Sequence, residues 1–70
     1  MIEEYDGFKR LVKGNRVRKY LDTSHTDYKD GTVIKGSHCD CDTYCYVQWD
    51  GENMLDMSVN LYHVVKLIDK

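Results

Sequence analysis

The apolar residues of this chain recur mainly at every second position, which is the pattern of β-strands with one buried face. Residues 16–21 show this alternation, because Val17 and Leu21 lie in phase on one face, and Val17 is predicted to belong to the core. The alternate positions are predicted to face solvent, and they carry basic or aromatic side chains: Arg16, Arg18 and Tyr20. This segment therefore predicts a half-buried strand with a basic and aromatic outer face.

A second alternating segment covers residues 43–49, where Cys45, Val47 and Trp49 form the predicted core face. The other face is predicted to lie on the solvent side: Tyr44, Tyr46 and Gln48. An Asp-Gly pair follows at residues 50–51, and it favours a hairpin because glycine adopts a positive φ without strain. We therefore expect the chain to reverse its direction here.

Three further segments complete the predicted sheet. Residues 31–35 and 64–68 are rich in Val, Ile, Leu or Thr, and most of these suit a pleated, half-buried surface. Residues 54–58 return from the hairpin as a further strand, with Leu55 and Met57 in phase on one face. Glycine and Asn or Asp mark the turns, and the chain contains no proline. This succession of short strands and turns predicts a small all-β fold.

The two ends of the chain carry different signals. Residues 1–12 fit two patterns, because Ile2, Tyr5 and Phe8 form one stripe of a helix whereas every second residue from Phe8 fits a strand. We therefore predict a short N-terminal helix or an extended lead-in. Near the other end, a single helical turn is predicted at residues 60–63 before the last strand.

The length of 70 residues allows one hydrophobic core and leaves little interior for a catalytic pocket. No nucleophile with a neighbouring base, paired carboxylates or phosphate-binding loop is recognisable, so we expect one non-enzymatic domain without a cofactor. The apolar runs fall far short of the ~20 residues of a membrane helix. The N-terminus is acidic, which is not the pattern of a secretory signal. We therefore expect a cytoplasmic protein with no membrane segment.

Four short motifs follow one another along the chain: Gly14-Asn15-Arg16-Val17, Asp30-Gly31-Thr32-Val33, Tyr46-Val47-Gln48-Trp49-Asp50-Gly51 and Val65-Lys66-Leu67-Ile68. Their order, with Leu61 in a helical turn before the last strand, resembles that of SH3-like barrels of the Tudor, KOW and chromo-barrel kind. The resemblance implies a small five-stranded SH3-like (Tudor-like) barrel at residues 13–70, preceded by the lead-in at residues 1–12. These barrels serve many unrelated functions, so the resemblance concerns the fold and leaves the function open.

Aromatic residues give the first candidate site. The resemblance implies a binding role for them, because Tudor-like domains use clustered aromatics at one barrel end to hold cations or peptides. We predict contacts with another protein through four residues: Tyr28, Tyr44, Tyr46 and Asp50. The alternative is that the tyrosines pair across strands and cover a small core. The leading prediction is a protein-binding module, monomeric or weakly dimeric, that regulates or inhibits a larger protein and could be of a virus-encoded type.

A run of basic residues gives the second candidate: Lys9, Arg10, Lys13, Arg16, Arg18 and Lys19. Such residues can contact several phosphates, and cations that alternate with aromatic rings are typical of nucleic-acid-binding surfaces. Nucleic-acid binding is therefore the alternative prediction. Against it stand the net charge of −2 and a sequence pI near 5.8, which favour a charged strand edge that prevents aggregation.

Thiol and imidazole side chains that lie close in the sequence give a third candidate: His38, Cys39, Cys41 and Cys45. Zinc prefers these ligand types, so zinc binding is a second alternative. Structural zinc sites usually combine two ligand pairs that are separated in the sequence. This chain has a single cluster of such residues and no second pair. We therefore predict no metal, a buried Cys45 and free thiols in a reducing compartment. The three histidines of the chain are interpreted as ordinary surface residues.

Overall fold

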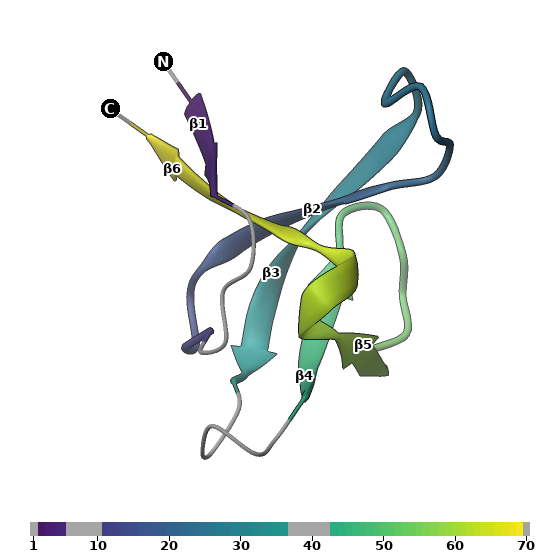
Figure 1. Cartoon of the computed structure of the whole chain (residues 1–70). Coiled ribbons are helices and arrows are strands. Elements are labelled where there is room, and N and C mark those ends of the chain that lie inside the picture. Colours follow the sequence, from purple (N-terminus) through teal and green to yellow (C-terminus); the bar gives the residue numbers. More distant parts are fainter. Residues whose placement is uncertain (1, 6–10, 37–42, 70) are drawn as a thin grey trace.

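Over the residues that it describes, the computed structural model shows six β-strands and one turn of 3₁₀ helix, so the fold is all-β as predicted (Figure 1). The structure describes residues 2–5, 11–36 and 43–69. The elements are, in chain order, β1 (Ile2–Tyr5), β2 (Arg16–Tyr20), β3 (Tyr28–Lys35), β4 (Tyr44–Trp49), β5 (Asp56–Asn60), η1 (Leu61–His63) and β6 (Val65–Asp69). Among the described residues no helix has the length and apolar character that crossing a membrane requires.

The strands form one antiparallel sheet in the order β1-β6-β2-β3-β4-β5. Strands β2 to β5 follow one another as neighbours, because short connections favour pairing between consecutive strands. Strand β6 then returns to pair with β2, and β1 pairs with the other edge of β6. The first and last strands of the chain therefore lie side by side, and both termini leave the sheet at the same corner (Figure 1).

The sheet curls, because β5 and β6 are far apart in strand order but close along the chain. A flat run from β6 to β5 with ~4.8 Å between strands would separate them by ~19 Å. The link from Asn60 to Val65 spans at most ~18 Å when extended, and less with the 3₁₀ turn η1 inside it. The sheet therefore bends around its concave face, although the described residues form no ladder between β5 and β6.

The hydrophobic core fills this concave face. Its buried residues are Leu11, Val17, Val33, Cys45, Val47, Trp49, Val59, Leu61 and Val64. Val17, Gly31 and Trp49 lie in one row across β2, β3 and β4. A Cβ atom on Gly31 would lie 2.7 Å from Cγ1 of Val47 and 2.8 Å from Cε3 of Trp49, so this glycine makes room for the large indole.

The alternation in residues 43–49 is confirmed, because Cys45, Val47 and Trp49 are buried and Tyr44 is 51% exposed. Val17 is buried as predicted, but Leu21, which is in phase with it in the sequence, is not buried. Leu21 is 52% exposed because β2 ends at Tyr20, and strand alternation no longer sets the direction of the next side chain.

The predicted strand at residues 54–58 begins later, at Asp56, and uses a different core residue. Val59 is buried, whereas Met57 is 60% exposed and Leu55 is half-buried. Two features cause the shift. The connection after Trp49 is longer than a two-residue hairpin, and the register of β4 with β5 is irregular between Cys45 and Val47.

The described part of the N-terminus is a strand, so the extended alternative holds there and the helical alternative does not. β1 also adds a sixth strand to the sheet, where five were predicted. The helical turn predicted before the last strand is confirmed as η1. Asn60 caps it by accepting a hydrogen bond from the backbone N–H of Tyr62 at 2.9 Å.

Candidate binding cleft

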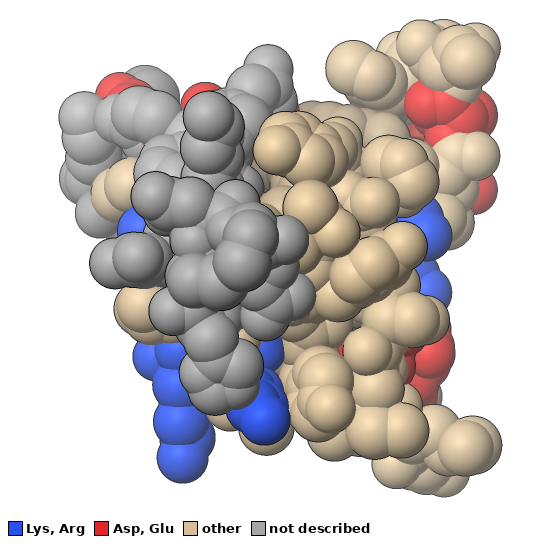
Figure 2. All heavy atoms as spheres, turned by 60° about the horizontal axis from the view of Figure 1, so that its bottom comes forward, with Lys and Arg blue, Asp and Glu red and all other residues tan. Residues whose placement is uncertain are grey.

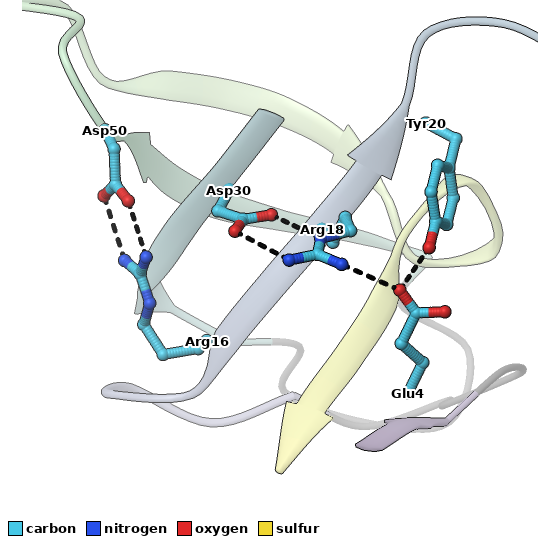
Figure 3. A network of polar contacts seen from close by, with 6 residues as sticks. All are labelled: Glu4, Arg16, Arg18, Tyr20, Asp30 and Asp50. Carbon is cyan, nitrogen blue, oxygen red and sulfur yellow. Dashed lines mark hydrogen bonds and ion pairs between the residues drawn. The ribbon is translucent and has the colours of Figure 1, made fainter. Parts of the chain in front are cut away.

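The convex outer face of β2 carries Arg16, Arg18 and Tyr20, as predicted, but each arginine has a carboxylate partner (Figure 3). The Arg16 guanidinium donates to Oδ1 and Oδ2 of Asp50 at 2.9 and 2.5 Å, and to Oγ1 of Thr32 at 2.8 Å. The hydrogen bonds from Arg16 lower the pKa of Asp50. Asp50, a predicted partner-binding residue, is therefore paired within the chain with Arg16 on β2.

Arg18 joins three strands. Its Nε and Nη2 donate to the two carboxylate oxygens of Asp30 on β3 at 2.8 and 3.1 Å, and its Nη1 donates to Oε1 of Glu4 on β1 at 3.1 Å. The hydrogen bonds to Asp30 raise the pKa of Arg18. Tyr20 donates its hydroxyl proton to the same Oε1 of Glu4, and this bond raises the pKa of the phenol.

These pairs change the interpretation of the basic run. β2 lies between β6 and β3, so it is not a strand edge, and its two arginines are matched by carboxylates. Lys13 and Lys19 form no ion pair with the described residues, and Lys9 and Arg10 lie outside the described residues. On the face in Figure 2, Lys and Arg side chains appear in separate groups, one of them interleaved with carboxylates.

The loop between β2 and β3 is organised by Asp22. Its Oδ1 accepts hydrogen bonds from the backbone N–H groups of Thr26 and Asp27 at 3.0 and 3.3 Å. Its Oδ2 accepts from the hydroxyls of Thr26 and Ser24 at 2.6 and 3.0 Å. These bonds, with that of the Thr26 hydroxyl the largest, lower the pKa of Asp22 to about 2. The loop is therefore a closed structure that fixes the backbone around His25.

His25 sits in this loop with φ at 58°, the left-handed region that non-glycine residues rarely adopt. Its ring stacks on Tyr20 with 4.2 Å between ring centroids. Tyr20 in turn meets Tyr28 edge to face at 5.9 Å, and the Arg18 guanidinium lies 3.9 Å from the centre of the Tyr28 ring. Strained residues tend to occur at functional sites, so this row of rings marks a candidate site.

One end of the row opens into a cleft of about 410 Å³, which we call the binding cleft. Its lining residues are Glu4, Tyr20, His25, Tyr62, His63, Val64 and Val65. They come from β1, β2, the Asp22 loop, η1 and the start of β6. The buried Leu61 anchors η1 in the core, and the Asn60 cap fixes the turn that carries Tyr62. The cleft thus joins aromatic rings, an apolar wall and one carboxylate.

The four predicted partner-binding residues do not form one site, and none of them lines the cleft. Tyr28 stands at the beginning of β3, whereas Tyr44 and Tyr46 lie toward the opposite end of the β3–β4 pair. Lys35 lies over the Tyr46 ring at 5.4 Å. Tyr28 therefore lies on the β2–β3 side of the sheet, whereas Tyr44 and Tyr46 lie on β4.

His25, His63 and Tyr62 line the cleft, and none of them was among the predicted site residues. The Ser, Thr and Asp residues around His25 could have predicted an ordered loop there, because their side chains bond to nearby backbone in tight turns. Nothing in the sequence signalled that η1 lies opposite this loop.

Of the four candidate zinc ligands, Cys45 is buried in the core, and His38, Cys39 and Cys41 lie outside the described residues. Within the described ranges, no three His, Cys, Asp or Glu residues gather in a way that could hold a metal ion.

The comparisons with known proteins give no relative from which a role could be transferred. No protein-family model, no curated protein and no solved structure matches this chain. The function is therefore argued from the geometry of the binding cleft.

Proposed function

We propose that this chain is a small, non-enzymatic protein-binding module whose binding cleft takes a cationic side chain of a partner protein. The observation that carries the proposal is the joint presence of the Tyr20, His25 and Tyr62 side chains and the Glu4 carboxylate in one cleft. Binding of this kind suits a regulator or inhibitor of a larger protein.

The chemistry of the lining supports a lysine or arginine as the ligand. A cation near the face of an aromatic ring gains roughly 0.5–2 kcal/mol, depending on how far it is desolvated. Val64 and Val65 offer apolar surface to the aliphatic stem of such a side chain. Glu4 supplies the negative charge, and Arg18 keeps its two bonds to Asp30 if Glu4 turns toward a ligand.

The order of elements supports an SH3-like barrel as the scaffold. Strands β2 to β5 run as a meander, the short turn η1 precedes β6, and β6 returns to β2, in line with the expectation from the sequence motifs. β1 is an addition to that plan. On this scaffold the binding cleft lies where η1 and the Asp22 loop meet.

Titration of the isotope-labelled protein with tetramethylammonium chloride tests the cleft with a minimal cation. We expect saturable changes in the amide signals of His25, Tyr62 and Val65, and none with sodium chloride at equal concentration. Tyr62→Ala removes a ring that is 60% exposed and should weaken this binding about three- to tenfold. Tyr44→Ala removes another exposed ring outside the cleft and is the matched control.

Selection of peptides from a phage-displayed library tests the protein partner. Selected peptides should contain lysine or arginine, lose affinity for the Tyr62→Ala variant and keep affinity for Tyr44→Ala. Peptides that depend instead on Tyr44 and Tyr46 would contradict the cleft and favour the outer face of β4 as the binding surface.

A further inference from the structure

We infer that β1 occupies a strand-acceptor site on the edge of β6, and that an extended acidic segment of a partner protein replaces it there. The inference rests on the proposed function in assigning a protein partner. The backbone edge of β6 lies beside the binding cleft, and Glu4 and Tyr20 belong to both. Three observations carry it: the weak attachment of β1, the pre-formed state of the site beneath it, and the charge of that site.

The attachment of β1 is limited to one neighbour. β1 is an edge strand of four residues and pairs with β6 alone. β2 covers β6 from Val65 to Leu67, so Ile68 and Asp69 pair with β1 and with no other strand. This overhanging ribbon projects from the body of the sheet (Figure 1). A two-stranded ribbon is marginally stable in water, so β1 is the strand that opens first.

The side chain of Glu4 anchors β1 to the rest of the sheet. Glu4 bonds to Arg18 and Tyr20 across β6, as Figure 3 shows. The buried residues of the described chain begin at Leu11, so the described side chains of β1 contribute nothing to the core. Removal of β1 therefore breaks the ladder to β6 and, among the contacts described above, those of Glu4.

The site stays ordered when β1 leaves. Arg18 keeps both of its bonds to Asp30, and its side chain is 18% exposed, so its position does not depend on Glu4. Tyr20 keeps its stacking contact with His25. A strand that arrives from a partner thus meets a pre-formed arginine and phenol, which lowers the entropic cost of binding.

The charge of the site selects the incoming strand. A carboxylate opposite Leu67, in the place of Glu4, reaches Nη1 of Arg18 and the Tyr20 hydroxyl. A lysine or arginine at that position would stand beside Arg18, and like charges at close range destabilise a pair of strands. The geometry therefore requires an extended segment with Asp or Glu at this one position, antiparallel to β6.

The test uses the full chain and two variants that remove one charge each. Glu4→Gln breaks the anchor, and Glu52→Gln removes a carboxylate that pairs with Lys29 on the β3–β4 side of the sheet. We expect the β1 amides of the wild-type protein to exchange hydrogen faster than those of β2 and β3. Glu4→Gln should speed β1 exchange at least about tenfold more than Glu52→Gln does.

A synthetic peptide with the sequence of residues 1–6 then serves as the incoming strand. Added to the Glu4→Gln protein, it should shift the amide signals of Leu67, Ile68 and Asp69, and a peptide with Gln at the Glu4 position should bind about tenfold more weakly.

Equal binding of both peptides, shifts confined to His25 and Tyr62, or β1 amides as protected as those of β2 would each overturn the inference. Dimer formation by Glu4→Gln without peptide binding would make a second copy the occupant and overturn it too. None of these results bears on tetramethylammonium binding by the wild-type cleft, so the two proposals fail separately.

Discussion

At the scale of single residues, Gly31 occupies a position in β3 that has no room for a side chain. An added Cβ would lie 2.7 Å from Val47 and 2.8 Å from both Trp49 and the backbone oxygen of Gln48. Backbone and a fully packed indole cannot move aside as a flexible side chain would. The glycine is therefore required by packing and not by a special backbone angle.

We expect Gly31→Ala to lower the free energy of unfolding by roughly 1–3 kcal/mol, the usual cost of overpacking a core. Urea unfolding followed by Trp49 fluorescence measures the change. Lys13→Ala, at an exposed position, is the control and should stay within about 0.5 kcal/mol of the wild type. A Gly31→Ala protein as stable as the control would show that the sheet relaxes around the new methyl group.

Asp22 gives a second prediction at this scale, because its pKa of about 2 rests first on the hydroxyl of Thr26. The folded pKa lies below the ordinary value of 3.8, so the carboxylate stabilises the loop fully above about pH 4 and loses this effect as the pH falls toward 2. Thr26→Val should raise the pKa toward its ordinary value. Thr23→Val, in the same loop, should leave it unchanged. Carboxyl carbon signals followed by NMR against pH provide the measurement, and a wild-type midpoint near 4 would contradict the bonding in this loop.

At the scale of elements, η1 decides the shape of one wall of the cleft. It is three residues long, so it depends on its buried anchor Leu61 and on its cap Asn60. Both features hold Tyr62 in place without contacting a ligand themselves. The cap and the cleft are therefore coupled through one short turn.

Asn60→Ala removes the acceptor for the Tyr62 backbone N–H and should cost about 1 kcal/mol of stability. Asn60→Asp keeps an acceptor oxygen and should retain most of that stability. Urea unfolding of the two variants gives the comparison. If alanine and aspartate prove equivalent, the cap does not hold the turn and the orientation of Tyr62 has another cause.

At the scale of the whole molecule, the two arginines of β2 are tied into the sheet by carboxylates from three other segments. Arg16 binds Asp50 after β4, and Arg18 binds Asp30 on β3 and Glu4 on β1. A phosphate would have to compete with bidentate pairs for both guanidinium groups. These ion pairs argue against nucleic-acid binding by the outer face of β2.

We therefore expect a mixed-sequence DNA or RNA oligonucleotide to cause no salt-sensitive change in the amide signals of residues 11–20. The titration is run at low and moderate salt, because phosphate contacts weaken steeply as salt rises. Salt-sensitive shifts in this range that disappear in the Arg16→Ala, Arg18→Ala double variant would revive the nucleic-acid hypothesis.

The sequence by itself determined the strands β2 to β6 in outline and the buried faces of β2 and β4. Val17 on β2 and Cys45, Val47 and Trp49 on β4 were predictable, because side chains alternate strictly between the two faces of a strand. The turn before the last strand was predictable as well. The prediction failed where β2 ends before Leu21 and where β5 shifts its register, because strand ends and bulges depend on the pairing partner.

The tertiary structure alone decided which charges pair and where a cleft forms. Arg16 lies 34 positions from Asp50, and Arg18 lies 14 positions from Glu4, so no local pattern could match them. The cleft likewise needs β1, the Asp22 loop and η1 together, and only the return of β6 along β2 places them around one space. Local periodicity sets the direction of a side chain, whereas the contacts that make a binding site depend on how distant segments pack.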